Sequence, residues 1–103
     1  MDLQYVADVA DTFIECLLSP LEGAHVFNLA GEVVHMDSFL STLRDIDTRS
    51  AELITASGPQ VPVAFRMDDS QLREKIGHIH KTPLVDGVTE TYERFRRLRQ
   101  STP

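Results

Sequence analysis

Residues 5–31 read YVADVADTFIECLLSPLEGAHVFNLAG, and they predict an amphipathic helix, a short turn and an apolar strand. Asp8 is placed to accept hydrogen bonds from the first turn of this helix, and Pro20 ends it. Gly23 then turns the chain into a strand at 24–29, whose nearly continuous apolar run suits burial on both faces of a sheet. A helix that leads into a buried strand is half of an α/β unit.

The rest of the chain predicts shorter elements around this unit. Further strands are expected at 3–6, 33–36 and 52–55. Further helices are expected from Asp37 or Ser38, from Asp68 or Asp69 as far as Gly77, and from 83 to 99 after Thr82, with an exposed turn over 57–62. The predicted fold class is therefore α/β, in an α+β-like fragment whose helices pack on a small mixed sheet, with 1–103 as a single domain.

Composition limits the classes of partner. The 103 residues include 10 basic and 16 acidic side chains, for a net charge of −6, which argues against nucleic acid and against an anionic membrane surface. The apolar stretches fall short of the ~20 residues that a membrane span needs. The first residues are acidic and unlike a signal peptide, and the single cysteine, Cys16, allows no internal disulfide, so we expect a cytoplasmic protein.

Several side chains are candidates for chemistry, each with a structural alternative. Cys16 could be a nucleophile, but it falls on the apolar face of the first predicted helix with no basic neighbour in sequence, which favours packing. His78 and His80 could bind a metal if the segment is extended. No cysteine or carboxylate at zinc-motif spacing completes that set, so no metal site is predicted.

The remaining candidates are arginines. Arg66 follows an apolar run and precedes Asp68 and Asp69, so it could face an anionic ligand, with pairing to these carboxylates or simple exposure as the alternatives. A second group lies near the end of the last predicted helix, where cations are favoured by the helix dipole and are partly neutralised by nearby glutamates. This group consists of Arg94, Arg96, Arg97 and Arg99. Two stabilising pairs are expected there, Glu90–Arg94 and Glu93–Arg97.

Three catalytic and cofactor motifs are missing from the 103 residues. There is no Gly-x-Gly-x-x-Gly or Walker-type loop to hold a phosphate, and no Gly-x-Ser-x-Gly. A Tyr-x-x-x-Lys pair is also lacking: the fourth residue after Tyr5 is Val9, and the fourth residue after Tyr92 is Arg96. We therefore predict no catalytic residues and no cofactor-binding residues in this chain.

Five stretches together resemble the C-terminal part of NAD-dependent epimerase/dehydratases, the extended short-chain dehydrogenase/reductase family. In that family a Tyr-Val-x-Asp-Val-Ala helix start precedes a Phe-Asn-Leu-Gly-like strand, and similar steps follow in the same order. The corresponding stretches here are 5–10, 26–31, 33–39, 69–77 and 81–91. Where many members carry Arg-Pro-Gly-Asp, this chain reads Ser57-Gly58-Pro59-Gln60.

The resemblance implies that the chain is the C-terminal, substrate-binding portion of such an enzyme, an isomerase or oxidoreductase. It implies a small sugar-type substrate, with Arg66 as the candidate contact, and NAD(P) held by the part of the family fold that carries the glycine-rich loop. This chain alone is expected to bind no cofactor and to lack catalysis. The alternative is a free-standing interaction module that reuses the fold and forms a homo-oligomer through an exposed strand.

Overall fold

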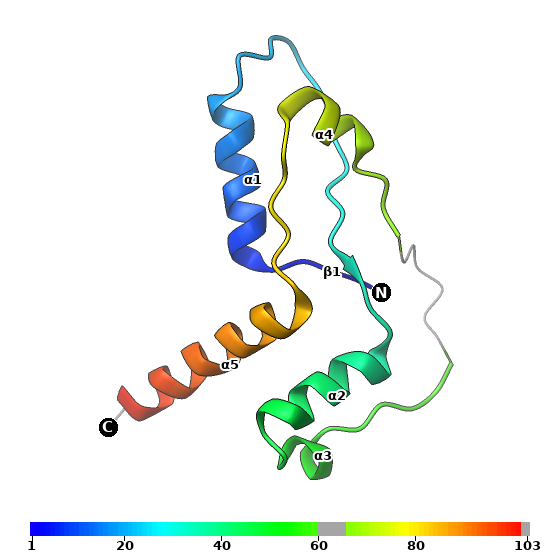
Figure 1. The fold of residues 1–103 in the computed structure, drawn as a ribbon, viewed down its shortest axis with the longest axis vertical. Helices are drawn as coiled ribbons and strands as arrows, with labels where there is room; N and C mark the ends of the chain where they lie inside the picture. The colour runs from blue at the N-terminus through cyan, green and yellow to red at the C-terminus, as the bar shows by residue number, and fades with distance from the viewer. Residues whose placement is uncertain (60–65, 102–103) are drawn as a thin grey trace. The chain divides into compact units, whose positions relative to one another are not determined.

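The computed structural model describes residues 1–59 and 66–101 (Figure 1). It combines helices with a small two-stranded antiparallel sheet, which agrees with an α/β or α+β class. In chain order the elements are β1 (Asp2–Leu3), α1 (Val6–Leu18), β2 (Glu32–Val33), α2 (Met36–Ile46), α3 (Ser50–Leu53), α4 (Ser70–Ile76) and α5 (Leu84–Ser101). Part of the predicted turn at 57–62 lies outside the described residues.

The tertiary contacts of the chain fall into two compact units. Among the described residues, the first unit contains 1–34 and 66–82, and the second contains 35–59 and 83–101. The first unit holds β1, β2, α1 and α4, and the second holds α2, α3 and α5. No helix within residues 1–59 and 66–101 is both long enough and apolar enough to cross a membrane.

The sheet of the first unit is antiparallel rather than mixed. Asp2 pairs with Val33 and Leu3 with Glu32. The pairing continues through two 2.8 Å hydrogen bonds in which Met1 and Val34 exchange N–H donors and carbonyl acceptors. The strands predicted at 3–6 and 33–36 are thus present as two-residue strands, each shifted toward the N-terminus.

The strand predicted at 24–29 is wrong, because this segment follows an extended course without a strand partner in the described structure (Figure 1). Phe27 and Leu29 are half-buried, whereas Val26 is 92% exposed. The side chains therefore alternate between inside and outside, as extended chain requires. An apolar run predicts a buried strand only when a neighbour supplies the hydrogen bonds of the ladder.

Helix α1 forms as predicted, but its first turn and its exposure differ from expectation. It begins after Tyr5, so Asp8 lies inside the first turn and is not the N-cap. It ends at Leu18, just before Pro20. Of the face predicted to be buried, Val9 and Cys16 are half-buried, whereas the larger side chains on its outer side are exposed. The first unit is too small to cover the whole apolar circumference of the helix.

In the second unit, α2 begins two or three residues earlier than predicted. His35 is the N-cap, and its Nδ1 accepts a hydrogen bond from the Asp37 backbone N–H at 3.2 Å, so neither Asp37 nor Ser38 caps the helix. Leu40 is buried on the inner face. The strand predicted at 52–55 is wrong, because α3 (Ser50–Leu53) occupies its first half. The Asp47 carboxylate accepts from the Arg49 N–H at 3.0 Å and closes the turn that starts this helix.

The two later helices agree better with the sequence. Asp69 is the N-cap residue of α4, although Asp68 Oδ1 accepts the hydrogen bond from the Ser70 N–H, at 3.0 Å. Gly77 ends α4 with a φ of +117°, a conformation that glycine adopts at little cost. Helix α5 begins at Leu84, one residue after the predicted start.

The surface of α5 departs from prediction near its C-terminus. The half-buried stripe contains Leu84, Val88 and Tyr92, but Phe95 is 69% exposed. The ion pair between Arg94 and Glu90 is present at 2.9 Å. The expected pairing of Glu93 with Arg97 is wrong. Arg97 instead lies 3.7 Å from Glu90, seven residues before it, and Arg96 lies 3.8 Å from Glu93 as an i,i+3 pair.

Candidate functional site

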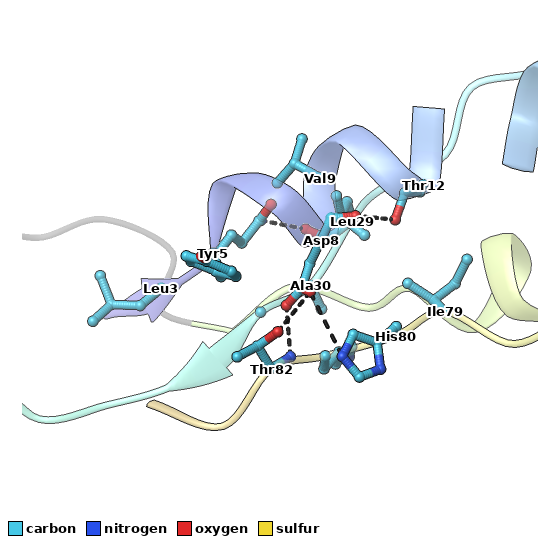
Figure 2. Close-up of a pocket in the computed structure, with 13 residues that line it drawn as sticks. Leu3, Tyr5, Asp8, Val9, Thr12, Leu29, Ala30, Ile79, His80 and Thr82 are labelled. Carbon is cyan, nitrogen blue, oxygen red and sulfur yellow. Dashed lines mark hydrogen bonds and ion pairs between the residues drawn. The ribbon is translucent and has the colours of Figure 1, made fainter. Parts of the chain in front are cut away.

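The Asp8 carboxylate interacts with Thr82 and His80 in the first unit (Figure 2). Its Oδ2 accepts a hydrogen bond from the Thr82 backbone N–H at 2.6 Å, and its Oδ1 accepts one from the Thr82 hydroxyl at 2.7 Å. His80 Nε2 lies 3.9 Å from the same Oδ1, close enough to add an ion pair when the ring is protonated. The carboxylate is only 13% exposed, so these contacts are largely shielded from water.

A small cavity lies beside this carboxylate. Its walls come from the start of α1, from residues 29–31 and from residues 79–82, which join α4 to α5 (Figure 2). Its volume is about 20 Å³, room for about one water molecule and too little for a substrate. Since Thr82 engages both oxygens of Asp8, the carboxylate anchors the 79–82 segment to α1.

A second carboxylate, the buried Asp69, also holds this connection, through Lys81, the residue next to Thr82. Arg73 Nε lies 2.9 Å from its Oδ1, and Lys81 Nζ lies 2.8 Å from its Oδ2. Burial raises the pKa of Asp69, but the two cations more than offset this effect and leave the pKa below its ordinary value. The carboxylate is therefore charged at neutral pH, and it ties α4 to the segment that follows it.

The stability of the first unit is expected to fall in acid because of Asp69. A carboxyl with a lowered pKa in the folded state contributes its full stabilisation above its unfolded value of 3.8 and loses it as the pH falls through the folded pKa. Urea unfolding between pH 2 and pH 7 should show this loss. Asp69→Asn should lower the stability at pH 7 and flatten the acid limb, whereas an unchanged acid limb would contradict the assignment.

The second unit has a polar cluster of its own, formed by Asp47, Arg49 and Tyr92. Arg49 donates two hydrogen bonds to the Asp47 carboxylate, from Nε to Oδ1 at 3.0 Å and from its terminal NH2 to Oδ2 at 2.7 Å. The Tyr92 hydroxyl donates to Asp47 Oδ2 at 2.6 Å. The hydrogen bonds from Arg49, and then that from Tyr92, hold the pKa of Asp47 well below its usual range. This cluster links the residue after α2 to α5.

Replacing Tyr92 with phenylalanine is expected to lower the stability of the second unit by about 1 kcal/mol, the net contribution of one hydrogen bond. The ring stays in place, so the loss reports the hydroxyl and not the packing. Denaturant unfolding followed by circular dichroism measures the change. In an Asp47→Asn background the effect should shrink, and an equal loss in both backgrounds would show that the hydroxyl acts elsewhere.

The structure does not bring the predicted substrate contact into a cluster. Arg66 is exposed, and the two aspartates that follow it are engaged by other groups, Asp68 by Ser70 and Asp69 by Arg73 and Lys81. Within residues 1–59 and 66–101, no ion pair joins Arg66 to either aspartate. Of the alternatives open to it from the sequence, the described structure therefore favours exposure.

The other candidate residues from the sequence are either packed or exposed. Cys16 is half-buried and lines an apolar pocket of about 350 Å³ between α1, residues 21–29 and α4, which agrees with a packing role. His78 and His80 are both exposed, and among the described residues no group of three potential metal ligands occurs. The four arginines of α5 are exposed, and at least three of them pair with glutamates of the same helix.

The strongest contacts were invisible to sequence reasoning. Asp8 and Thr82 are 74 residues apart, and Asp47 and Tyr92 are 45 apart. No local pattern connects such pairs. A partial signal existed for Asp47 alone, because an aspartate in a polar loop favours a turn in which its carboxylate accepts the backbone N–H two residues on.

Comparisons with known proteins add no relative: no protein-family model, curated protein or solved structure matches this chain.

Proposed function

We propose that the chain is the C-terminal, substrate-binding portion of an NAD-dependent epimerase/dehydratase that acts on a nucleotide sugar or a related molecule. In this proposal it has no catalysis of its own. The 103 residues contain neither a glycine-rich dinucleotide loop nor a Tyr-x-x-x-Lys pair, so NAD(P) and the reacting groups belong to another part of the enzyme. A single cysteine favours a reducing compartment such as the cytoplasm.

The observation that carries the proposal is where the resembling stretches meet. Asp8 belongs to the first stretch, Gly31 to the second and Thr82 to the fifth. All three line the cavity shown in Figure 2, and Asp8 bonds directly to Thr82. Three of the five stretches thus contribute to one small cavity, and two of them are joined by hydrogen bonds. Their meeting is what a shared fold core would produce.

Arg66 is the proposed contact for the anionic part of the substrate. It is exposed and leaves Asp68 and Asp69 to other partners, so its guanidinium is available to a phosphate. Arginine suits this role because its planar fork can donate two parallel hydrogen bonds to phosphate oxygens.

Calorimetric titration of the chain with NAD, NADP and a uridine diphosphate sugar tests the proposal. We expect no heat with either dinucleotide and weak binding of the sugar nucleotide. Arg66→Ala should weaken that binding about tenfold, the effect of one charge-assisted contact, while Arg99→Ala, another exposed arginine, should leave it unchanged. Clear binding of NAD would overturn the proposal. If Arg66→Ala leaves the affinity for the sugar nucleotide unchanged, only the assignment of Arg66 as the substrate contact would fall.

A second candidate function is a free-standing interaction module that forms a homo-oligomer. The favouring observation is the extended segment at 24–28, where Val26 is 92% exposed. An extended backbone with an exposed apolar side chain can pair with a second copy. Sedimentation at micromolar concentration should then show a dimer that Val26→Lys converts to monomer, whereas a stable monomer of the unaltered chain would rule this function out.

A further inference from the structure

The outer side of α1 carries an apolar stripe that the described residues of the first unit leave uncovered. Val6, Phe13 and Leu17 are 75%, 73% and 82% exposed, and their spacing of seven and four residues places them on one face of the helix. Leu18, 74% exposed, and Ile14, 52% exposed, widen this face. Large apolar side chains that gather on one surface mark a protein contact more often than isolated ones do. The five residues are called the α1 stripe below.

The charge beside the α1 stripe has one sign. Asp11 and Glu15 are exposed on the side of the helix next to Ile14 and Leu18, and α1 contains no basic residue. Asp8, the remaining acidic side chain of the helix, is held by Thr82 and faces the inside of the unit. Within residues 1–59 and 66–101 no ion pair compensates Asp11 or Glu15, so a partner that covers the stripe meets two negative charges along one edge.

We propose that the α1 stripe binds an amphipathic helix of another protein, one that carries lysine or arginine beside its apolar face. Such a helix buries the stripe and places cations against Asp11 and Glu15. Two copies of α1 packed on each other would bring like charges together, and an anionic bilayer would repel the same carboxylates. The inference rests on α1 alone and goes beyond the proposed substrate-binding role.

Two synthetic helical peptides test this inference. Both are 18 residues long and present the same leucine face, but one carries lysines and the other glutamates on its polar side. Fluorescence anisotropy of the labelled peptides, titrated with the intact chain, should show at least about tenfold tighter binding of the lysine peptide. Raising the salt concentration should reduce this preference, because the contact is at the surface.

Variants of the chain assign the site. Leu17→Ser should weaken binding of the lysine peptide about tenfold, as expected for a central apolar contact, whereas Leu53→Ser should have no effect. Leu53 is a matched control because it is 80% exposed and lies in α3. Asp11→Asn with Glu15→Gln should remove the preference for lysine, while Glu52→Gln with Glu74→Gln, which alters two exposed glutamates elsewhere, should retain it.

Circular dichroism of each variant checks that the helices are intact before binding is compared. Equal binding of both peptides would overturn the inference by showing general hydrophobic adhesion. Self-association that Leu17→Ser abolishes, with no binding of the lysine peptide, would also overturn it and would assign the stripe to a second copy. Preferential binding to lipid vesicles containing phosphatidylserine would contradict the charge argument.

Discussion

Replacing Gly31 with alanine is expected to disrupt the first unit, at a cost of about 3 kcal/mol in the free energy of unfolding. A Cβ at this position would overlap the backbone carbonyl oxygen of Leu3. The backbone of β1 cannot withdraw without breaking its pairing with β2. The same shift would lengthen the 2.8 Å hydrogen bond from the Gly31 N–H to the Asp2 carboxylate.

Amide hydrogen exchange measures this effect unit by unit. Protection of the Val34 N–H, which bonds to the Met1 carbonyl, should fall sharply, while the Asp47 N–H at the end of α2 should be unaffected. Gly58→Ala is the contrasting variant. Its added Cβ would meet no atom within 4 Å, and only its φ of +99° is unfavourable, so a cost of about 1 kcal/mol is expected. Equal losses for the two variants would contradict the steric explanation.

Replacing Asp8 with alanine is expected to cost roughly 3 kcal/mol, because two hydrogen bonds to a shielded carboxylate are lost together. The Thr82 N–H and hydroxyl would both lose their acceptor. The segment that joins α4 to α5 would then be held through the buried side chain of Ile79 and through the ion pair of Lys81 with Asp69. Denaturant unfolding and exchange of the Thr82 N–H measure the loss.

Asp11→Ala is the matched control for Asp8→Ala, since it removes an exposed carboxylate from the same helix. Its effect should stay below about 0.5 kcal/mol, as is usual for surface substitutions. A double-mutant cycle with Thr82→Val isolates the hydroxyl contact. A coupling energy near zero between positions 8 and 82 would show that the carboxylate stabilises the fold by another route.

Asp69 and Asp47, the partner of Tyr92, are anchors of the same kind. In each case a carboxylate whose pKa lies below its ordinary value joins a helix to a segment outside it. Each unit therefore combines such an anchor with a small apolar core. Only five apolar residues are buried among those described, namely Ala30, Val34, Leu40, Leu72 and Ile79.

Local signals predicted the helices well and the strands poorly. Pro20 and Gly77 marked two helix ends correctly, because proline has no N–H to continue a helix and glycine tolerates a positive φ. The strands at 24–29 and 52–55 failed for the opposite reason. A strand depends on a partner that the local sequence does not contain, and a short apolar run satisfies several backbone conformations equally well.

For the candidate sites, too, neighbours in the sequence predicted some environments and not others. Exposure of His78 and His80 and packing of Cys16 could be anticipated from their neighbours. The role of Asp8 could not, because an aspartate near a helix start is expected to cap it. Here the helix begins at Val6, and this leaves the carboxylate free to bind Thr82.

The sequence by itself determined the approximate extents of α1, α2, α4 and α5, where proline and glycine interrupt the chain, and that one side of α1 is apolar. These properties depend on backbone dihedrals and on spacing within a few residues. Only the tertiary structure decided that Asp8 meets Thr82, that Asp69 joins Arg73 to Lys81, and that the outer side of α1 remains exposed. Such contacts join residues far apart in the chain, and their free energy exists only after the chain has folded.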